Sequence, residues 1–342
     1  MKQIQIPESY SAVVLDSFKG AENLRIELRP VPELNPNEVL VKVAASPINP
    51  SDLAFLEGHY DSKKRPPVVP GFEGSGTVLA TGKSMMARNL LGKRVACLSQ
   101  DTGDGVWAEY MVTTAKLALP LHRSVSLEQG AMSVVNPLTA ISFLEIARKG
   151  GHKTVVQTAA ASTLGRMFSR LCQTEGIRVI NIVRHKSHVE LLNKQGAEIV
   201  LNSSESEFQQ KLSDVCHQYG SRLAFDAVAG PLSHQLIEAM PPRSKVTVYG
   251  ALSHELVMAN PGQLIFQNKA IDGFWLTESL AKKNLLQFLK IWRRTQKLLL
   301  KELKSDIRIK YPLKEVKTAI QDYQKQMTGG KVLLVMQKNQ MI

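Results

Sequence analysis

The stretch "TAAASTLGR", residues 158–166, follows the apolar run "KTVVQ" and opens the helix-like run "MFSRLCQTEG". Dinucleotide-binding chains place the pattern Gly-x-Gly-x-x-Gly at a strand-to-helix turn of this kind. Only the last glycine, Gly165, is present here, and Ala160 and Ser162 occupy the other two positions. The turn therefore has two interpretations. It is a phosphate-binding turn with two glycines replaced, or a plain connection between a strand and a helix.

Short apolar runs alternate with amphipathic ones around this turn. The apolar runs are "KTVVQ", "RVINIV", "EIVLN", "LAFDAV" and "KVTVYG", and Gly176, Gly196 and Gly220 stand where three of the intervening helices should end. Strand–helix alternation with nearly continuous apolar strands is typical of a parallel sheet covered by helices on both faces. We therefore predict an α/β fold whose doubly wound, Rossmann-type parallel sheet lies in a domain spanning residues 125–276.

The rest of the chain has a different pattern. Residues 1–124 carry β-branched or alternating apolar runs separated by Gly, Pro and Asn, which predicts a compact β-rich domain. A helical pattern then begins after Ser126 and is interrupted at Pro137. The segment 277–342 ends in a helix, a glycine turn and an apolar strand. We expect that strand to return to the first sheet, so that residues 1–124 and 277–342 form one discontinuous domain.

Bulk composition excludes several classes of protein. Across 342 residues, 44% are hydrophobic and 21% charged, as in ordinary globular proteins, and no apolar run is long enough to span a bilayer. Without a signal-peptide pattern, a cytoplasmic location is expected. The three cysteines are scattered, so we interpret them as small buried residues and not as disulfide or metal partners: Cys97, Cys172 and Cys216.

The net charge of +13 is concentrated in "KKR" at 63–65 and between Lys282 and Lys317. The second region predicts an amphipathic helix, with Leu285, Phe288, Leu289, Trp292 and Leu299 at helical spacing and basic residues between them on a solvated face. Because no zinc-finger or RNA-recognition pattern accompanies the charge, nucleic-acid binding is only a minor alternative.

The end of the second apolar strand indicates which coenzyme would bind. An NAD-binding chain places Asp or Glu there to bind the ribose 2′-hydroxyl, whereas "RVINIV" is followed by Arg184, His185 and Lys186. Arg binds a 2′-phosphate in bidentate fashion, and Lys adds a point charge. At the turn itself, Ser162 offers a hydroxyl donor and Gly165 allows close packing of helix and strand. We predict NADPH over NADH; the alternative is ordinary solvated charge at a strand end.

Several motifs occur in one order along nearly the whole chain: "SPINPSDL" at 46–53, "VPGFEGSGTV" at 69–78, "NPLTA" at 136–140, "GFWL" at 273–276 and "GGKVLLV" at 329–335. In these motifs the chain resembles the medium-chain dehydrogenase/reductase superfamily, and within it the zinc-independent quinone oxidoreductases and enoyl thioester reductases. The resemblance implies that the β-rich domain is the GroES-like catalytic domain and that residues 125–276 bind NADPH.

The resemblance also predicts that no metal is bound. Zinc members carry Gly-His-Glu where this chain has Gly71, Phe72 and Glu73, and they use cysteines that this chain lacks. Without a Lewis acid, alcohol dehydrogenation is not expected. What remains is hydride transfer to an acceptor that needs little activation, namely a quinone or an α,β-unsaturated carbonyl compound.

Site residues follow from the same resemblance. It places Asn49, Tyr60, Asn136 and Thr139 beside the nicotinamide and the active cleft. The remaining cofactor-binding residues are Ala160, Ser162, Thr163, Leu164 and Gly165 of the turn, the cations Arg184, His185 and Lys186, then Tyr249, Gly250, Ala251, Phe274, Trp275 and Leu276, and Lys331 at the edge of the cleft. Asn49 and Tyr60 are the candidate catalytic residues.

Tyr60 would donate a hydrogen bond or a proton to a substrate carbonyl, because a phenol with a pKa near 10 stays protonated at neutral pH. The alternative is that Tyr60 only packs in a loop beside the cleft. We interpret His59 as a surface residue, Trp107 as core or cleft wall, and Asp226 as the end of a strand and not a base.

The leading hypothesis is an NADPH-dependent quinone or enone reductase that acts on a small molecule and binds no membrane. A trans-2-enoyl thioester reductase for CoA or acyl-carrier substrates is the alternative, which the basic residues Lys63, Lys64 and Arg65 would suit. A catalytically weak cofactor- or RNA-binding relative is a further alternative. The apolar strand "AIDGFWL", if it forms a sheet edge, predicts a homodimer.

Overall fold

The computed structural model describes residues 6–336, which form two compact units. The first unit runs up to Val135 and resumes at Lys304, and the second unit is Asn136–Leu303. The predicted boundaries lie elsewhere, because residues 125–135 group with the first unit and residues 277–303 with the second.

Polar contacts explain both differences. The Ser75 hydroxyl donates to the carbonyl oxygen of Leu127 at 2.5 Å, which attaches residues 125–135 to the first unit. The Arg170 guanidinium donates to the carbonyl oxygen of Glu302 at 2.7 Å, which attaches the segment before Lys304 to the second unit. Neither contact follows from a local sequence pattern.

The second unit is built on a six-stranded parallel sheet with the order β10-β9-β8-β11-β12-β13. This is the strand order of a doubly wound dinucleotide-binding fold, so the predicted fold class is confirmed. Its strands are β8 (Thr154–Gln157), β9 (Arg178–Val183), β10 (Ile199–Asn202), β11 (Leu223–Asp226), β12 (Lys245–Val248) and β13 (Ala270–Gly273). Its helices are α4 (Val135–Lys149), α5 (Thr163–Thr174), α6 (Lys186–Lys194), α7 (Phe208–Gln218), α8 (Pro231–Ala239), α9 (Pro261–Phe266), α10 (Leu276–Ala281) and α11 (Leu285–Leu298).

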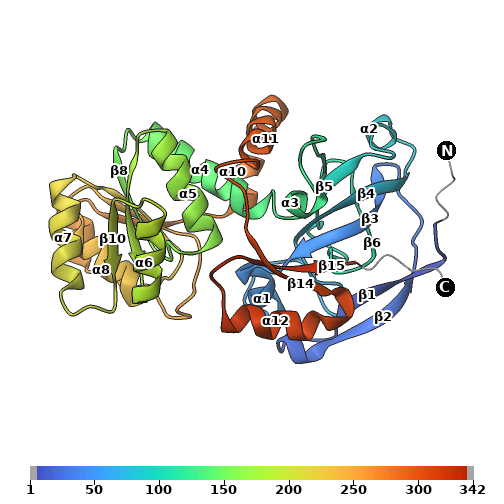
Figure 1. The fold of residues 1–342 in the computed structure, drawn as a ribbon, viewed down its shortest axis with the longest axis horizontal. Helices are drawn as coiled ribbons and strands as arrows, with labels where there is room; N and C mark the ends of the chain where they lie inside the picture. Colours follow the sequence, from blue (N-terminus) through green and yellow to red (C-terminus); the bar gives the residue numbers. More distant parts are fainter. Residues whose placement is uncertain (1–5, 337–342) are drawn as a thin grey trace. The chain divides into compact units, whose positions relative to one another are not determined.

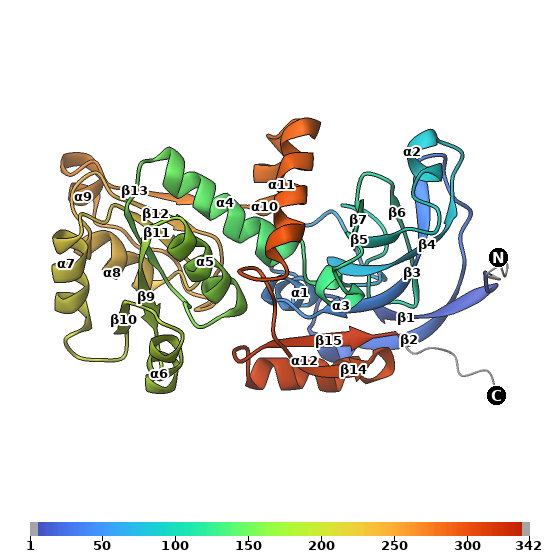
Figure 2. The same cartoon turned by 45° about the horizontal axis from the view of Figure 1, so that its top comes forward.

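Helices cover both faces of this sheet (Figures 1 and 2). Successive residues of β11 point to opposite faces. Ala224 packs with the apolar side chains of α7 and α8, whereas the Phe225 ring stacks on Phe143 of α4 and meets Phe168 of α5 edge to face. The apolar run "LAFDAV" is therefore buried on both sides, which is why it shows no alternation with polar residues.

The predicted helix ends are confirmed. Gly176, Gly196 and Gly220 follow α5, α6 and α7 with φ of 68°, 81° and 59°, a backbone region that glycine enters without strain. Ser126 caps α3 (Leu127–Ala131) by accepting a hydrogen bond from the N–H of Gln129.

The first unit contains a seven-stranded sheet, mostly antiparallel, in the order β14-β15-β3-β4-β5-β7, with β6 also paired to β3. Its elements are β1 (Ser9–Leu15), β2 (Leu24–Pro30), β3 (Glu38–Pro47), α1 (Pro50–Leu56), β4 (Glu73–Thr81), α2 (Met85–Arg88), β5 (Arg94–Leu98), β6 (Tyr110–Thr114), β7 (Ala118–Pro120), α3 (Leu127–Ala131), β14 (Ile307–Pro312), α12 (Val316–Lys325) and β15 (Lys331–Val335). Short 3-10 helices lie at Ala21–Asn23 and Leu313–Glu315. The strand β15 pairs antiparallel with β3, so the predicted return of the C-terminal strand is confirmed.

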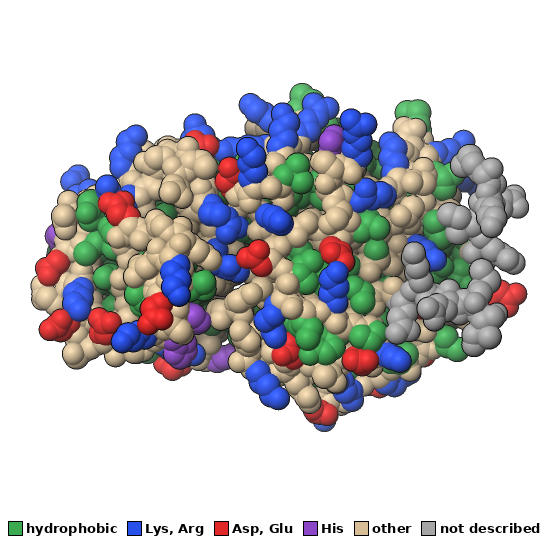
Figure 3. Space-filling model, viewed as in Figure 1, with side chains coloured by type: hydrophobic (Ala, Val, Ile, Leu, Met, Phe, Trp, Pro, Cys, Tyr) green, Lys and Arg blue, Asp and Glu red, His purple; other side chains and the backbone are tan. Residues whose placement is uncertain are grey.

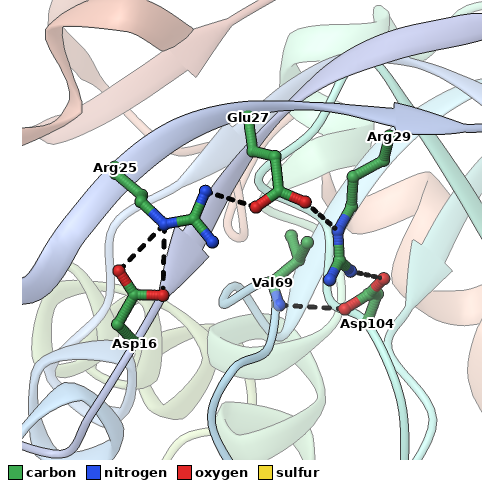
Figure 4. Close-up of polar contacts among 6 residues, drawn as sticks. All are labelled: Asp16, Arg25, Glu27, Arg29, Val69 and Asp104. Atoms are coloured by element: carbon green, nitrogen blue, oxygen red, sulfur yellow. Dashed lines mark hydrogen bonds and ion pairs between the residues drawn. The ribbon is translucent and has the colours of Figure 1, made fainter.

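A separate two-stranded ribbon, β1–β2, is tied to the loop before β6 by an ion pair (Figure 4). Arg29 donates to the Asp104 carboxylate at 2.5 Å, and the other carboxylate oxygen accepts from the N–H of Val69 at 2.9 Å. Asp104 thereby joins the ribbon to the segment that leads into Phe72. Trp107, three residues later, is fully buried in the core.

Three side chains differ from their predicted surroundings. Lys64 is buried, 3% exposed, because its ammonium donates to the carbonyl oxygen of Gly103 at 2.5 Å, so it adds no charge to the surface. In α11, Leu285 and Leu289 are exposed while Ile291 and Trp292 are buried, so the predicted apolar face was wrong at Leu285 and Leu289. The exposure of each of these side chains depends on which residues from other parts of the chain pack against it.

Among residues 6–336, no helix combines the length and the apolar character that a bilayer crossing requires. The three cysteines are all buried, as predicted.

Candidate active site

The turn that follows β8 is tightly packed. Ser162 is the N-cap of α5, where its hydroxyl oxygen accepts from the N–H of Gly165 at 3.1 Å. A Cβ atom on Gly165 would lie 2.5 Å from the carbonyl oxygen of Ala160, so only glycine fits there. Gly165 thus has the packing role that the third glycine has in dinucleotide-binding turns.

The two replaced glycine positions differ in their surroundings. Ala160 is fully buried, and its N–H donates to the carbonyl oxygen of Ile182 at 3.1 Å, so this amide is used within the sheet. Ala159 has a φ of 48°, which is uncommon for a residue with a Cβ atom. Thr163 and Leu164 open α5, whose N-terminal end carries the positive end of the helix dipole. An anion at this turn would meet the helix end and the Ser162 hydroxyl.

The predicted cations lie at the end of the neighbouring strand. β9 pairs in parallel with β8, so the residues after both strands lie at the same edge of the sheet. Arg184, His185 and Lys186 follow β9 directly, are exposed, and lead into α6. The backbone of Arg184 is held by the Ser204 hydroxyl, which donates to its carbonyl oxygen at 2.8 Å. His188, one turn into α6, has a pKa lowered by burial and by the charges of His185 and Arg184.

Asp226 ends β11, next to the same turn, and its carboxylate is saturated with hydrogen bonds. It accepts from the Thr158 hydroxyl at 2.7 Å, from the Ser233 hydroxyl at 2.5 Å, and from the N–H groups of Val228 and Ala229. Such a carboxylate organises its loops, which agrees with the prediction that Asp226 is not a base.

Residues predicted after the last strands gather around an aromatic side chain of α4. The ring centroid of Phe143 lies 4.8 Å from that of Tyr249 and 5.0 Å from that of Phe274. Trp275 is the N-cap of α10, which begins at Leu276. Gly250 and Ala251 follow Tyr249 in the loop after β12, and Asn136 and Thr139 lie in the first turns of α4.

In the first unit, Asn49 lies in a buried polar cluster. Its Nδ2 donates to Glu73 Oε1 at 2.9 Å, and its Oδ1 accepts from the ammonium of Lys331. Asn49 and Lys331 are 1% and 4% exposed. Lys331, predicted at the cleft edge, is thus directed at Asn49, although the two residues are 282 positions apart in the chain.

Two carboxylates of this cluster were not predicted as site residues. Asp52 accepts from the N–H of Asn49 at 2.8 Å and from that of Phe72 at 3.2 Å, and Glu73 accepts from the N–H of Val135 at 2.9 Å. Burial raises the pKa of Asp52 to about 7, raises the pKa of Glu73 and lowers the pKa of Lys331. The only sequence signal for these two carboxylates was that each is the single charged residue of its motif, Asp52 in "SPINPSDL" and Glu73 in "VPGFEGSGTV".

Tyr60, four residues beyond the end of α1, lies against Phe72 with ring centroids 4.7 Å apart. It borders a surface hollow of about 310 Å³ that is also lined by Phe18, His59 and Arg65. Phe72 in turn meets Phe55 edge to face. His59 is a surface residue, as predicted, with 69% of its side chain exposed.

These residues do not fit a zinc ion. The Phe72 ring, which has no donor atom, packs among aromatic rings, and the Cys97 thiol is buried with its pKa raised by desolvation. Over residues 6–336, no three His, Cys, Asp or Glu side chains are grouped to hold a metal ion.

Comparison with known proteins agrees with this architecture. Residues 35–123 match the alcohol dehydrogenase GroES-like domain, and residues 163–290 match the zinc-binding dehydrogenase family. The mitochondrial enoyl-[acyl-carrier-protein] reductase of Caenorhabditis elegans is 32% identical over 247 residues, which cover 70% of this chain and 69% of the relative.

Solved structures extend the match to nearly the whole chain. A provisionally assigned NADPH:quinone reductase from Mesorhizobium loti is 34% identical, with a TM-score of 0.90, covering 97% of this chain and all of its own. A mycobacterial protein complexed with NADPH shares the fold at 23% identity, with a TM-score of 0.83 and coverage of 96% and 100%.

The chain belongs to the medium-chain dehydrogenase/reductase superfamily. It is an oxidoreductase of this superfamily.

Proposed function

We propose that this protein is a zinc-independent reductase that uses NADPH to reduce a quinone or an α,β-unsaturated carbonyl compound. The observation that carries the proposal is the exposed group Arg184, His185 and Lys186 at the sheet edge that also presents the N-terminus of α5. These cations suit a 2′-phosphate, and no carboxylate stands among them to bind a ribose hydroxyl.

The turn and the aromatic group would hold the rest of the coenzyme. Ser162 and the start of α5 would bind the pyrophosphate, and Ala160 and Gly165 keep strand and helix close. Tyr249, Gly250, Ala251, Phe274, Trp275 and Leu276 would enclose the nicotinamide end, with Asn136 and Thr139 of α4. The bound coenzyme supplies a hydride to the acceptor.

The chain's own contribution to the chemistry would come from Tyr60 and Asn49. Tyr60 would donate a hydrogen bond or a proton to the substrate oxygen, which acquires charge during reduction. Such acceptors delocalise the added charge as hydroquinone or enolate, so the reaction needs no Lewis acid. The aromatic packing of Phe72 in place of a metal ligand supports this assignment.

Calorimetric titration with NADPH and NADH tests the cofactor assignment. Replacing Arg184→Gln should weaken NADPH binding about 10- to 100-fold, since it removes charge-assisted hydrogen bonds, and should leave NADH binding unchanged. Lys194→Gln is a matched control, because it removes one exposed charge at the other end of α6. Equal affinities for both coenzymes in the unaltered protein would refute the proposal.

A second candidate function is reduction of a 2-enoyl thioester carried by CoA or by an acidic carrier protein, as the names of several relatives suggest. Helix α11 supports this alternative. Its exposed face presents Leu286 and Leu289, followed by Lys290, Arg293 and Lys297 around a shallow depression. Figure 3 shows Lys and Arg side chains gathered over the part of the surface where Figure 1 labels α11. Apolar residues beside a row of cations suit an acidic protein partner.

Steady-state rates separate the two candidates. The protein would be assayed with NADPH and, in turn, a small quinone, crotonyl-CoA and a crotonyl thioester of a purified acyl carrier protein. If the carrier docks on α11, Arg293→Glu should raise KM for the carrier thioester alone, and the same change at Lys194 should not. Turnover of the quinone with no turnover of either thioester would exclude the second candidate.

A further inference from the structure

The amide of Asn49 is held between opposite charges. Its oxygen accepts from the Lys331 ammonium, and its NH2 group donates to the Glu73 carboxylate. A flipped amide would direct its NH2 group at an ammonium and its oxygen at a carboxylate, and both contacts would be repulsive. Lys331 and Glu73 therefore determine which way the Asn49 amide points.

The second oxygen of Glu73 holds the start of α4. It accepts from the N–H of Val134 at 3.2 Å and from that of Val135 at 2.9 Å. A carboxylate suits this position, because the first N–H groups of a helix have no partner within the helix and carry partial positive charge. Val135 is the last residue of the first unit and the first residue of α4, so one carboxylate contacts both Asn49 and the backbone where α4 begins.

Lys331 supplies the cation that makes this arrangement stable. Its charge opposes the desolvation of both Glu73 and Asp52, which are each 1% exposed. Removing one charged partner from a buried group leaves the others without compensation and is strongly unfavourable. Lys331 comes from β15, so the C-terminal strand completes a cluster otherwise made by α1 and β4.

We propose that Lys331 is a positioning residue, which orients the Asn49 amide and, through Glu73, fixes the two residues where α4 begins. In the structure the ammonium contacts Asn49, which lies in the same unit. The kinetic part of this inference rests on the proposed reductase function, whereas the structural part does not.

Hydrogen–deuterium exchange of the protein without substrate tests the structural part. Glu73→Gln leaves one acceptor oxygen in place of two, and Lys331→Met removes the cation. Both changes should speed exchange at the amides of Val134 and Val135 by about tenfold or more, the effect of losing a hydrogen bond to a charged group. Lys331→Arg should preserve protection.

Ser46→Ala provides a matched control. The buried Ser46 hydroxyl donates to the backbone carbonyl oxygen of Glu73 at 2.7 Å and does not touch its carboxylate. This change should leave exchange at the start of α4 as it is in the unaltered protein. Should Lys331→Met not fold, Glu73→Gln and Lys331→Arg give the same comparison. Unchanged exchange in Glu73→Gln would overturn the proposal.

Kinetics and binding separate positioning from direct coenzyme contact. In Lys331→Met, kcat should fall at least tenfold while the dissociation constant for NADPH changes less than threefold, and Lys331→Arg should recover most of kcat. A weakened NADPH affinity with unchanged kcat would assign Lys331 to the coenzyme and overturn the proposal. If the unaltered protein turned over no acceptor, the proposed function would fail, and the exchange experiment would still decide the positioning role.

Discussion

Replacing Asp52→Asn should flatten the dependence of stability on pH. Asp52 is buried at the third residue of α1, and its pKa rises from 3.8 to about 7, chiefly through desolvation and in part through the charge of Glu73. Between these values the folded protein holds a proton on Asp52 that the unfolded chain has released. The contribution of Asp52 to the free energy of unfolding therefore falls as pH rises from about 4 to about 7.

The magnitude follows from the size of that difference. A pKa difference of about 3, at about 1.4 kcal/mol for each tenfold change in proton affinity, corresponds to about 4 kcal/mol of stability. Roughly 2.5 kcal/mol of this loss falls between pH 5 and pH 8. Asparagine stays neutral throughout, so Asp52→Asn should lack this part of the slope. It should be less stable than the unaltered protein at pH 5, because one oxygen cannot accept from both Asn49 and Phe72.

Urea unfolding at pH 5, 6, 7 and 8, followed by circular dichroism, measures the effect. The free-energy difference between the unaltered protein and Asp52→Asn should shrink by about 2.5 kcal/mol across this range. Asp214→Asn, which changes an exposed carboxylate on α7, is the control and should keep the original slope. A difference that stays constant from pH 5 to pH 8 would show that Asp52 is ionised in the folded protein, and the reasoning would fail.

Three further changes test other parts of the structure. Phe143→Ala should destabilise the second unit by about 3–5 kcal/mol, because the ring stacks on Phe225 at 4.1 Å; urea unfolding measures this, and a loss below 1 kcal/mol would contradict it. Tyr60→Phe should slow enone reduction about 100-fold or more if the phenol donates a proton, with quinone reduction less affected; equal rates in an enone assay would leave Tyr60 a packing residue. The edge strand β13, with Phe266 86% exposed nearby, predicts a homodimer of twice the 37.8 kDa chain mass by light scattering, weakened by Phe266→Ser. A monomer at micromolar concentration would argue against it.

Two predictions that rested on local patterns were accurate. Alternating apolar and amphipathic runs identified the doubly wound sheet, and the glycines after α5, α6 and α7 marked where those helices end. Helix periodicity failed at the start of α11, where Leu285 and Leu289 recur at the right spacing but are 65% and 38% exposed. Periodicity shows that a helix has an apolar face and not that another element packs against it.

Some residues of the candidate site could likewise be predicted from local patterns, and others could not. Gly165 and the cations after β9 could be predicted because a strand, a turn and a helix in direct succession determine where they lie. The roles of Asp52 and Glu73 could not, since each is an isolated charge whose partners come from distant segments. Lys64 shows the same limit. Its sequence neighbours Lys63 and Arg65 are exposed, whereas the carbonyl oxygen of Gly103 and the charges of Asp104 and Asp101 compensate the buried ammonium of Lys64.

By itself, the sequence determined the order of strands and helices, the glycine-dependent turn and the absence of a metal ligand at Phe72. These depend on side-chain size, backbone freedom and hydrophobic period, which are properties of a few consecutive residues. Only the tertiary structure shows that Lys331, on the last strand, lies against Asn49. It also shows that the carboxylate of Glu73 accepts from the N–H of Val135, the first residue of α4, which is 62 residues further along the chain. A buried charge is tolerated only where the fold brings compensating groups within hydrogen-bonding distance, and those groups come from parts of the chain that no local pattern connects.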